Sequence, residues 1–127
     1  MDPISDMLIR IKNAAAAGHT SASMPHSRMK QEIARALERA GFVGKAERKG
    51  KRVKKTLEVA LAGGRRGVVL SGVHLLSTPG RRRYVSHREL RPAPRGGVII
   101  LTTSKGVLTG SEARKQKVGG QLIAEVW

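Results

Sequence analysis

The spacing of apolar residues changes once along this chain, and that change constrains the fold more than any other feature. Before Gly41, apolar residues recur every three or four positions, which is the period of an amphipathic helix. After Phe42 they alternate with polar residues, which is the period of a strand with one buried face. A helix-rich segment followed by a strand-rich segment predicts the α+β class.

The first helix is expected over residues 3–17. Asp2 and Pro3 are typical of an N-cap and a first helical turn, and Gly18 supplies a stop. A short strand over residues 21–24 should follow. The apolar stripe of this helix consists of Ile4, Leu8, Ile11 and Ala15.

A second helix is expected to begin after Ser27, which can cap it, and to end at Gly41. Residues 42–48 and 56–61 should pair as a hairpin around Gly50, which completes the order α-β-α-β-β. The apolar stripe of the second helix consists of Met29, Ile33, Leu37 and Ala40.

Glycine and arginine interrupt the pattern over residues 63–67, so we expect a domain boundary there. It divides the chain into two small domains, residues 1–64 and residues 65–127. The second domain should be mainly antiparallel β with one short helix, because Thr109 and Glu112 have capping-box spacing. We expect strands over 68–76, at 84–85, over 98–101 and over 122–127, a turn at 78–80, a proline-containing crossover at 86–97 and a helix over 110–117.

The chain carries a large positive charge. It has 25 Lys and Arg against 9 Asp and Glu among 127 residues, a net charge of +16. Apolar and polar residues stay mixed along the chain, which favours a folded basic surface over a disordered basic arm. Such a surface is expected to bind a partner made of phosphates.

Composition excludes several functions. Without cysteine the chain has no disulfide, thiolate zinc site or cysteine nucleophile. The 4 histidines lack ligand spacing, and no phosphate-binding glycine loop or catalytic acid motif occurs, so no enzyme activity, metal or cofactor is expected. The first residues, with acidic Asp2 and helix signals, do not have the basic start and apolar stretch typical of a signal peptide, and no apolar run approaches the ~18 residues of a membrane span, so a cytoplasmic location is expected.

A small hydroxyl-rich loop is expected after the apolar run of residues 98–101. Ser and Thr hydroxyls donate and accept hydrogen bonds, Lys binds phosphate, and Gly allows close approach to the backbone. Because the deep major groove of A-form RNA excludes side chains, RNA recognition uses irregular sites and the 2′-hydroxyl, which suits such a loop. The alternative is that these hydroxyls only cap a turn. The loop consists of Thr102, Thr103, Ser104, Lys105 and Gly106.

The segment over residues 77–84 is a second candidate, because it joins a proline-containing turn to an arginine run and to Tyr84, the chain's 1 tyrosine. Arginine binds phosphate through two parallel hydrogen bonds, and a tyrosine ring can stack on an unpaired base. The alternative is a solvated edge strand with Tyr84 as core filler.

The hairpin around Gly50 is strongly basic. We expect it to make phosphate contacts without sequence preference, although each cation could instead lie on a solvated face. With 1 Phe, 1 Tyr and 1 Trp, the chain has too few aromatic residues for the stacking platform of an RNA-recognition sheet. The cations are Lys45, Arg48, Lys49, Lys51, Arg52, Lys54 and Lys55.

Short motifs along most of the chain are similar to those of one known family. In the first half they are residues 2–8, 10–14, 24–27 and 40–42. In the second half they are Gly72, Ser77, Pro79, Gly80 and Tyr84, followed by residues 102–107, 112–115 and 118–120. On these residues the chain resembles, nearly end to end, the bacterial small-subunit ribosomal protein eight family.

The resemblance implies two small α/β domains and direct, early binding to the central domain of 16S ribosomal RNA, where the protein helps to organise the platform of the small subunit. It also implies small-subunit proteins five and twelve as neighbours. In some bacteria the family represses translation of its own messenger RNA, so the operon messenger RNA is a further expected partner.

Carried over by position, the resemblance places Thr103 and Ser104 at bases and sugars of a distorted RNA helix, with Tyr84 close by. Two residues depart from the family pattern. Thr102 stands where serine is usual, and Gln121 stands where glutamate is usual. A carboxylate only accepts hydrogen bonds, whereas an amide donates and accepts them, so a family contact through that acid is in doubt.

The complete set of residues expected to contact RNA spans both halves. In the second half it is Thr102, Thr103, Ser104, Lys105, Gly106, Tyr84, Ser77, Pro79, Arg81, Arg82, Arg83 and Gln121. In the first half it is Arg10, Lys12, Asn13, Lys54 and Lys55. The rival function is a general basic protein that binds nucleic acid in the nucleoid, or an anionic membrane surface, which the same charge would permit.

Overall fold

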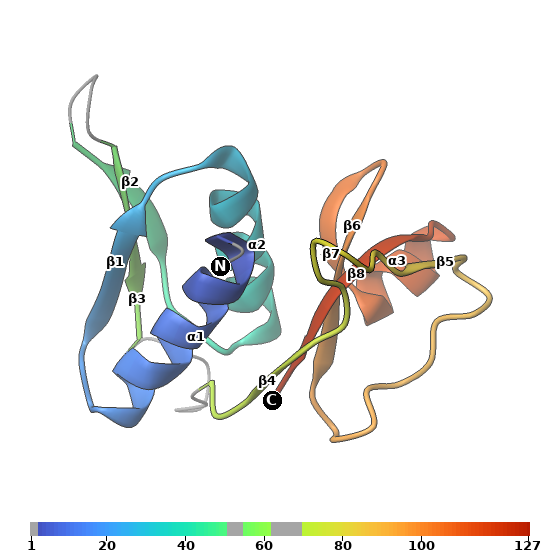
Figure 1. Ribbon diagram of the computed structural model, residues 1–127, viewed down its shortest axis with the longest axis horizontal. Helices are drawn as coiled ribbons and strands as arrows, with labels where there is room; N and C mark the ends of the chain where they lie inside the picture. Colours follow the sequence, from blue (N-terminus) through green and yellow to red (C-terminus); the bar gives the residue numbers. More distant parts are fainter. Residues whose placement is uncertain (1–2, 51–54, 62–69) are drawn as a thin grey trace. The chain divides into compact units, whose positions relative to one another are not determined.

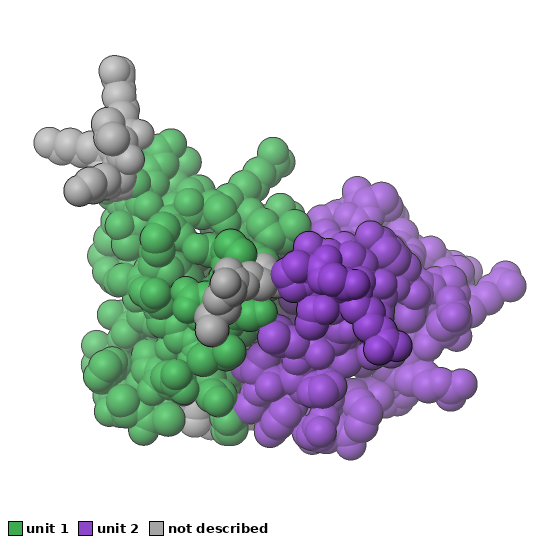
Figure 2. All heavy atoms as spheres, in the orientation of Figure 1, with its two compact units in different colours: residues 1, 3–71 green, residues 2, 72–127 purple. Residues whose placement is uncertain are grey.

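The computed structural model describes residues 3–50, 55–61 and 70–127. The described residues form two compact units, one up to Ser71 and one from Gly72 onward (Figure 2). The domain boundary expected between residues 64 and 65 lies outside the described residues and stays a prediction. Unit 1 has the order α-β-α-β-β, and unit 2 has antiparallel strands with a short helix (Figure 1), so the predicted α+β class is confirmed.

Helix α1 (Pro3–Ala16) forms where the helical spacing predicted it. Its apolar stripe buries Leu8 and Ile11 completely. The chain leaves the helix at Gly18, whose φ of 77° lies in the left-handed region that favours glycine. The N-cap expected at Asp2 lies outside the described residues.

Helix α2 (Arg28–Ala40) has both predicted caps. The Ser27 hydroxyl accepts a hydrogen bond of 3.1 Å from the backbone N–H of Lys30, and Gly41 has a φ of 88°. The prediction that Met29 belongs to the buried stripe is wrong, because 39% of Met29 is exposed. The buried stripe instead includes Ala34 and Ala36, whose small side chains let the helix pack closely. The buried residues of α2 are Ile33, Ala34, Ala36 and Leu37.

Sheet A consists, among the described residues, of β1 (Ser21–Pro25), β2 (Ala46–Lys49) and β3 (Thr56–Ala60). Strand β3 lies in the middle and pairs antiparallel with both neighbours. Its buried side chains, Leu57 and Val59, alternate with partly exposed ones, as the two-residue period predicted. Helices α1 and α2 lie on the same side of this sheet (Figure 1). The predicted hairpin is confirmed.

Sheet B is built around β8 (Gly120–Val126). Strand β6 (Val98–Thr103) pairs with one edge of β8, and β4 (Val73–Leu75) and β5 (Tyr84–Val85) pair with the other. Strand β7 (Gly106–Thr109) extends the sheet beyond β6. All these pairings are antiparallel, as predicted for the second half of the chain.

The strand boundaries of unit 2 differ from the prediction in four places. Strand β8, expected over 122–127, runs from Gly120 to Val126. Within the described residues, the strand expected over 68–76 is restricted to β4. Strand β6 continues past Leu101 to Thr103, because threonine is as suited to a strand as the apolar residues before it. Strand β7 was not predicted, because Val107 and Leu108 are too short an apolar run to show a period.

Helix α3 (Gly110–Gln116) begins with the predicted capping box. The Thr109 hydroxyl accepts from the backbone N–H of Glu112 at 3.2 Å, and the Glu112 carboxylate accepts from the backbone N–H of Thr109 at 2.9 Å. The helix packs on β6 and β7. The core beneath it consists of Leu90, Leu101, Leu108, Ala113 and Leu122.

An ion pair between a buried carboxylate and a half-exposed arginine attaches the crossover of residues 86–97 to β8. The carboxylate of Glu125, which is 2% exposed, accepts two hydrogen bonds of 2.9 Å, one from the backbone N–H of Arg95 and one from its guanidinium. The same guanidinium lies 4.8 Å from the centre of the Trp127 ring. A Cβ atom at Gly97 would overlap the carbonyl oxygen of Val126, so the crossover approaches β8 closely.

We expect Arg95→Ala to lower the free energy of unfolding by about 3 kcal/mol, because the substitution leaves the buried Glu125 carboxylate without its charged partner. The matched control is Arg91→Ala, an exposed arginine of the same crossover, which should change it by less than about 0.5 kcal/mol. Urea unfolding followed by circular dichroism measures both. Equal losses in the two variants would contradict a structural role for the ion pair.

Candidate nucleic-acid interface

The hydroxyl-rich segment is the end of a β-hairpin and not an open loop. Thr103 of β6 pairs with Gly106 of β7, which leaves Ser104 and Lys105 as a two-residue turn. Gly106 has a φ of 100°, a conformation that favours glycine. Thr102 and Thr103 therefore lie in a strand, which corrects their expected place in a loop.

The hydroxyls of this hairpin differ in what they can offer a ligand. The Thr103 hydroxyl donates to the carbonyl oxygen of Gly106 at 2.8 Å and accepts from the backbone N–H of Lys105 at 3.0 Å, so it stabilises the turn. The Ser104 side chain is exposed, and its hydroxyl has no hydrogen-bond partner among the described residues. The tip thus presents the Ser104 hydroxyl and the Lys105 ammonium to solvent.

A row of polar side chains crosses sheet B next to this tip. Tyr84 of β5 pairs with Gln121 of β8, and Gln121 pairs with Thr102 of β6. Because directly paired residues project from the same face of a sheet, the phenol, the amide and the hydroxyl share one surface. Tyr84 is 69% exposed, so the alternative in which it fills the core is wrong. We call Tyr84, Gln121 and Thr102 the polar row.

Two glycines allow the strands of the polar row to approach each other. A Cβ atom at Gly120 would overlap the carbonyl oxygen of Thr102, and one at Gly119 would overlap the carbonyl oxygen of Val85. Any other residue at these positions would separate the strands. The double glycine before Gln121 therefore has a packing role that brings the row together.

Residues 77–83, which we call the arginine segment, lie beside the polar row. The carbonyl oxygen of Arg83 accepts from the backbone N–H of Leu122 at 2.9 Å, which holds the segment along β8. Thr78 and Arg81 exchange backbone hydrogen bonds of 3.0 Å across the predicted turn. The side chains of Pro79, Arg81, Arg82 and Arg83 are exposed.

Ser77 is buried, unlike the exposed residues that follow it. It is 6% exposed, and its hydroxyl accepts from the backbone N–H of Arg83 at 3.0 Å. Within the part of the chain that the structure describes, none of Arg81, Arg82 and Arg83 forms an ion pair with a carboxylate. Ser77 thus shapes the turn, while the guanidiniums stay available to phosphate.

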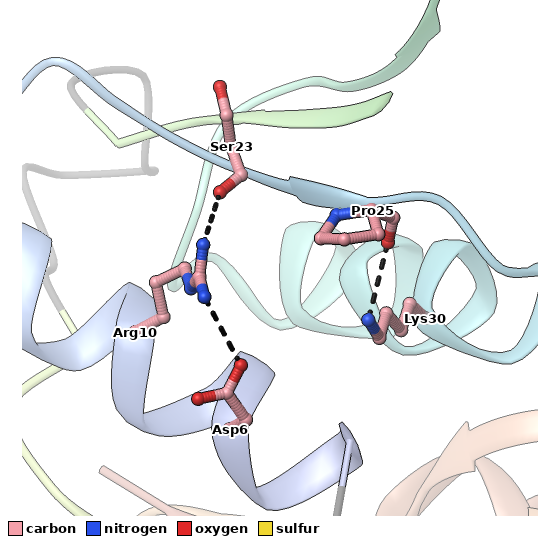
Figure 3. Close-up of polar contacts among 5 residues, drawn as sticks. All are labelled: Asp6, Arg10, Ser23, Pro25 and Lys30. Atoms are coloured by element: carbon pink, nitrogen blue, oxygen red, sulfur yellow. Dashed lines mark hydrogen bonds and ion pairs between the residues drawn. The ribbon is translucent and has the colours of Figure 1, made fainter. Parts of the chain in front are cut away.

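In unit 1, Arg10, one of the cations expected to bind RNA, and Lys30, which was not among them, are engaged within the protein. Arg10 forms an ion pair of 3.3 Å with Asp6 and donates to the carbonyl oxygen of Ser23 at 3.1 Å (Figure 3). Lys30 donates to the carbonyl oxygen of Pro25 at 3.3 Å (Figure 3). These carbonyls belong to β1, an edge strand of sheet A, so both cations protect that edge.

The other residues expected on the polar face of α1 remain accessible. Asn13 is exposed and Lys12 is half-buried. Neither side chain has a hydrogen bond or ion pair with another described residue. Lys12 is therefore a better candidate than Arg10 for a phosphate contact.

The basic hairpin of unit 1 also contains internal ion pairs. Lys45 lies 3.4 Å from Glu47, and Lys49 lies 3.0 Å from Glu58. The hydrogen bond and the charge of Glu58 raise the pKa of Lys49 above its usual value. Lys55 is exposed. Lys51, Arg52 and Lys54 lie outside the described residues.

The described residues hold no cluster of three or more metal-ligating side chains. The His26 ring lies 2.8 Å from the amide oxygen of Gln31, a contact between side chains of unit 1. None of the helices in the described ranges is long and apolar enough to cross a membrane.

Unit 2 presents a hydroxyl, an amide, a phenol and cations without acidic partners among the described residues. These groups can bind RNA by hydrogen bonding, stacking and charge.

Comparisons with known proteins agree with this chemistry. A family model described as ribosomal protein S8 matches residues 2–127. The small ribosomal subunit protein uS8 of Thermus thermophilus is 47% identical over 135 residues, which cover 99% of this chain and 98% of that protein. The uS8 protein of Bifidobacterium animalis subsp. lactis is 43% identical over 129 residues, covering 99% and 97%. The chain therefore belongs to the ribosomal protein S8 family, a family of non-enzymatic structural proteins of the small ribosomal subunit.

Proposed function

We propose that this protein is a structural constituent of the small subunit in the cytoplasmic ribosome and binds the central domain of 16S ribosomal RNA directly, helping to assemble the platform. One observation carries the proposal: the polar row and the Ser104 tip place an exposed phenol, an amide and an unpartnered hydroxyl side by side. A basic protein that bound nucleic acid or membranes by charge alone would not need such a surface. Membership in the ribosomal protein S8 family supports the choice of RNA.

Each group has a distinct task in the proposed contact. The Ser104 hydroxyl donates to or accepts from a base edge or a 2′-hydroxyl, and the Tyr84 ring stacks on an unpaired base. Gln121 both donates and accepts, so it can pair with RNA groups that a carboxylate would repel. Thr103 and Gly106 hold the turn, and Ser77 holds the arginine segment. Lys105 and the arginines then bind phosphate.

Unit 1 supplies charge in this proposal, and unit 2 supplies specificity. Lys12, Lys55 and Lys54 would contact phosphates, Asn13 would add a hydrogen bond, and Arg10 would act mainly by protecting the edge of β1. Small-subunit proteins five and twelve are the proposed protein neighbours. The operon messenger RNA is a proposed second ligand, if it presents the same RNA shape.

We expect Ser104→Ala to weaken binding to a 16S central-domain fragment by about 1–3 kcal/mol, because an RNA polar group loses its partner. Thermal stability should not change, since Ser104 is exposed. The matched control is Ser111→Ala, an exposed serine of α3 in the same unit, which should leave affinity unchanged. Filter binding at fixed salt measures both. Equal affinities of the two variants would remove Ser104 from the interface.

Arg82→Ala should behave differently from Ser104→Ala. Loss of a phosphate contact lowers affinity for all nucleic acids alike and makes the slope of log affinity against log salt shallower by about one unit. The measurement is a salt titration of the wild type and both variants with the 16S fragment and with unrelated RNA. If both substitutions reduced affinity equally for every RNA, the division between specific and charge-based contacts would be refuted.

Competition decides between the proposed function and the rival basic protein. At physiological salt, the 16S central-domain fragment should displace bulk duplex DNA and anionic lipid vesicles from the protein, because binding by charge alone falls steeply with salt. Fluorescence anisotropy with labelled 16S fragment and each competitor measures this. Equal competition by DNA or vesicles would favour the rival.

A further inference from the structure

A cavity of about 620 Å³ lies in unit 2 between the crossover and sheet B. Its walls come from the crossover, including Pro92 and Pro94, and from β4, β5, β6 and β8. Its volume is in the range of cavities that hold small molecules or the side chains of a bound peptide. None of the groups proposed for the polar row lines it.

The cavity and the polar row lie on opposite faces of sheet B. Val85 and Leu122 line the cavity, whereas the residues that directly precede them, Tyr84 and Gln121, belong to the polar row. Successive side chains of a strand project from opposite faces. A ligand in the cavity and RNA on the polar row would therefore not compete for the same groups.

The floor of the cavity is aliphatic. Leu76, Val85, Ile99 and Leu122 supply it, and the lining contains no hydroxyl or amide side chain and no Phe, Tyr or Trp. His74, an exposed residue of β4, supplies an imidazole ring at the cavity, but a base that entered the aliphatic floor would have much of its polar edge desolvated against hydrocarbon. An aliphatic side chain would instead bury its whole surface favourably.

The rim of the cavity is cationic. Arg83, Arg88 and Arg91 are exposed there, and among the described residues none of them forms an ion pair with a carboxylate. The lining holds four arginines and two acids, Glu89 and Glu125. Glu125 binds Arg95, and Glu89 accepts a 2.9 Å hydrogen bond from the backbone N–H of Ser86, which lowers the pKa of Glu89. The rim therefore favours an anionic ligand.

We propose that this cavity binds a segment of a partner protein in which aliphatic side chains are flanked by carboxylates. The aliphatic side chains fill the floor, and the carboxylates form paired hydrogen bonds with the guanidiniums of the rim. An aliphatic centre with arginines at its edge is also the usual composition of a protein–protein contact. The inference does not depend on the proposed RNA contact, because the cavity and the polar row have no residue in common, although Arg83 of the RNA-contact set also lines the cavity.

The probe for this proposal is a fluorescein-labelled peptide of two central leucines flanked on each side by aspartate and glutamate. The full-length protein should bind it, and affinity should fall when serines replace the leucines or amides replace the carboxylates. In the protein, Arg88→Glu combined with Arg91→Glu should weaken binding by roughly tenfold. The charge-matched control combines Arg114→Glu with Lys115→Glu, two exposed cations of α3 outside the cavity, and should bind as the wild type does.

Methyl NMR of the wild-type protein tests the place of binding without any substitution. The peptide should shift the methyl signals of Leu76, Val85, Ile99 and Leu122, and a bound 16S fragment should not release it. Shifts elsewhere, equal binding of the leucine-free peptide, or equal losses in the two double variants would overturn the proposal. So would displacement of the peptide by oligouridylate of equal charge, which would assign the cavity to RNA. Failure of 16S binding alone would leave these results standing.

Discussion

The hydrogen-bonded ladder around β8 is the interaction on which unit 2 depends. Among the described residues three strands pair with β8, and two of them, β4 and β5, have no other strand as a partner. Gly119 and Gly120 let the neighbouring backbones approach at the end where the polar row forms. At the other end, Glu125 attaches the crossover. Alternation along this one strand then assigns Gln121 to one face and Leu122 to the other.

The two units use their positive charge differently. In unit 1, Arg10, Lys45 and Lys49 each have an acidic partner, so their charge is partly compensated before any ligand arrives. In unit 2, Arg95 is paired with Glu125, whereas the other exposed arginines of the turn and of the crossover have no carboxylate partner within the described residues. Because guanidiniums without an acidic partner bind phosphate and carboxylate more strongly, these arginines are good candidates for anion binding.

The candidate site was only partly predictable. The pattern identified Ser104, Lys105 and Tyr84 as surface groups, because hydroxyl, cation and lone aromatic residues in one half of a basic chain are typical of RNA contacts. The pattern did not distinguish the Thr103 hydroxyl, which forms two hydrogen bonds within the turn, from the Ser104 hydroxyl, which has no partner among the described residues. It also missed Arg88 and Arg91, whose only sequence signal is a repeated arginine in a proline-containing crossover.

Local pattern was sufficient for the helices, for three of their caps and for the α+β class, because capping and amphipathic periodicity act within a few residues of the chain. Ser27, Gly41 and Thr109 were predictable for this reason. The alignment of Tyr84 with Gln121 and Thr102 was not, since it depends on the register between strands far apart in the sequence. Nor was the cavity, because its lining combines the crossover with four strands, and contacts such as the Arg95–Glu125 ion pair join these distant segments. Interactions between distant segments, whose partners no local spacing specifies, created both surfaces.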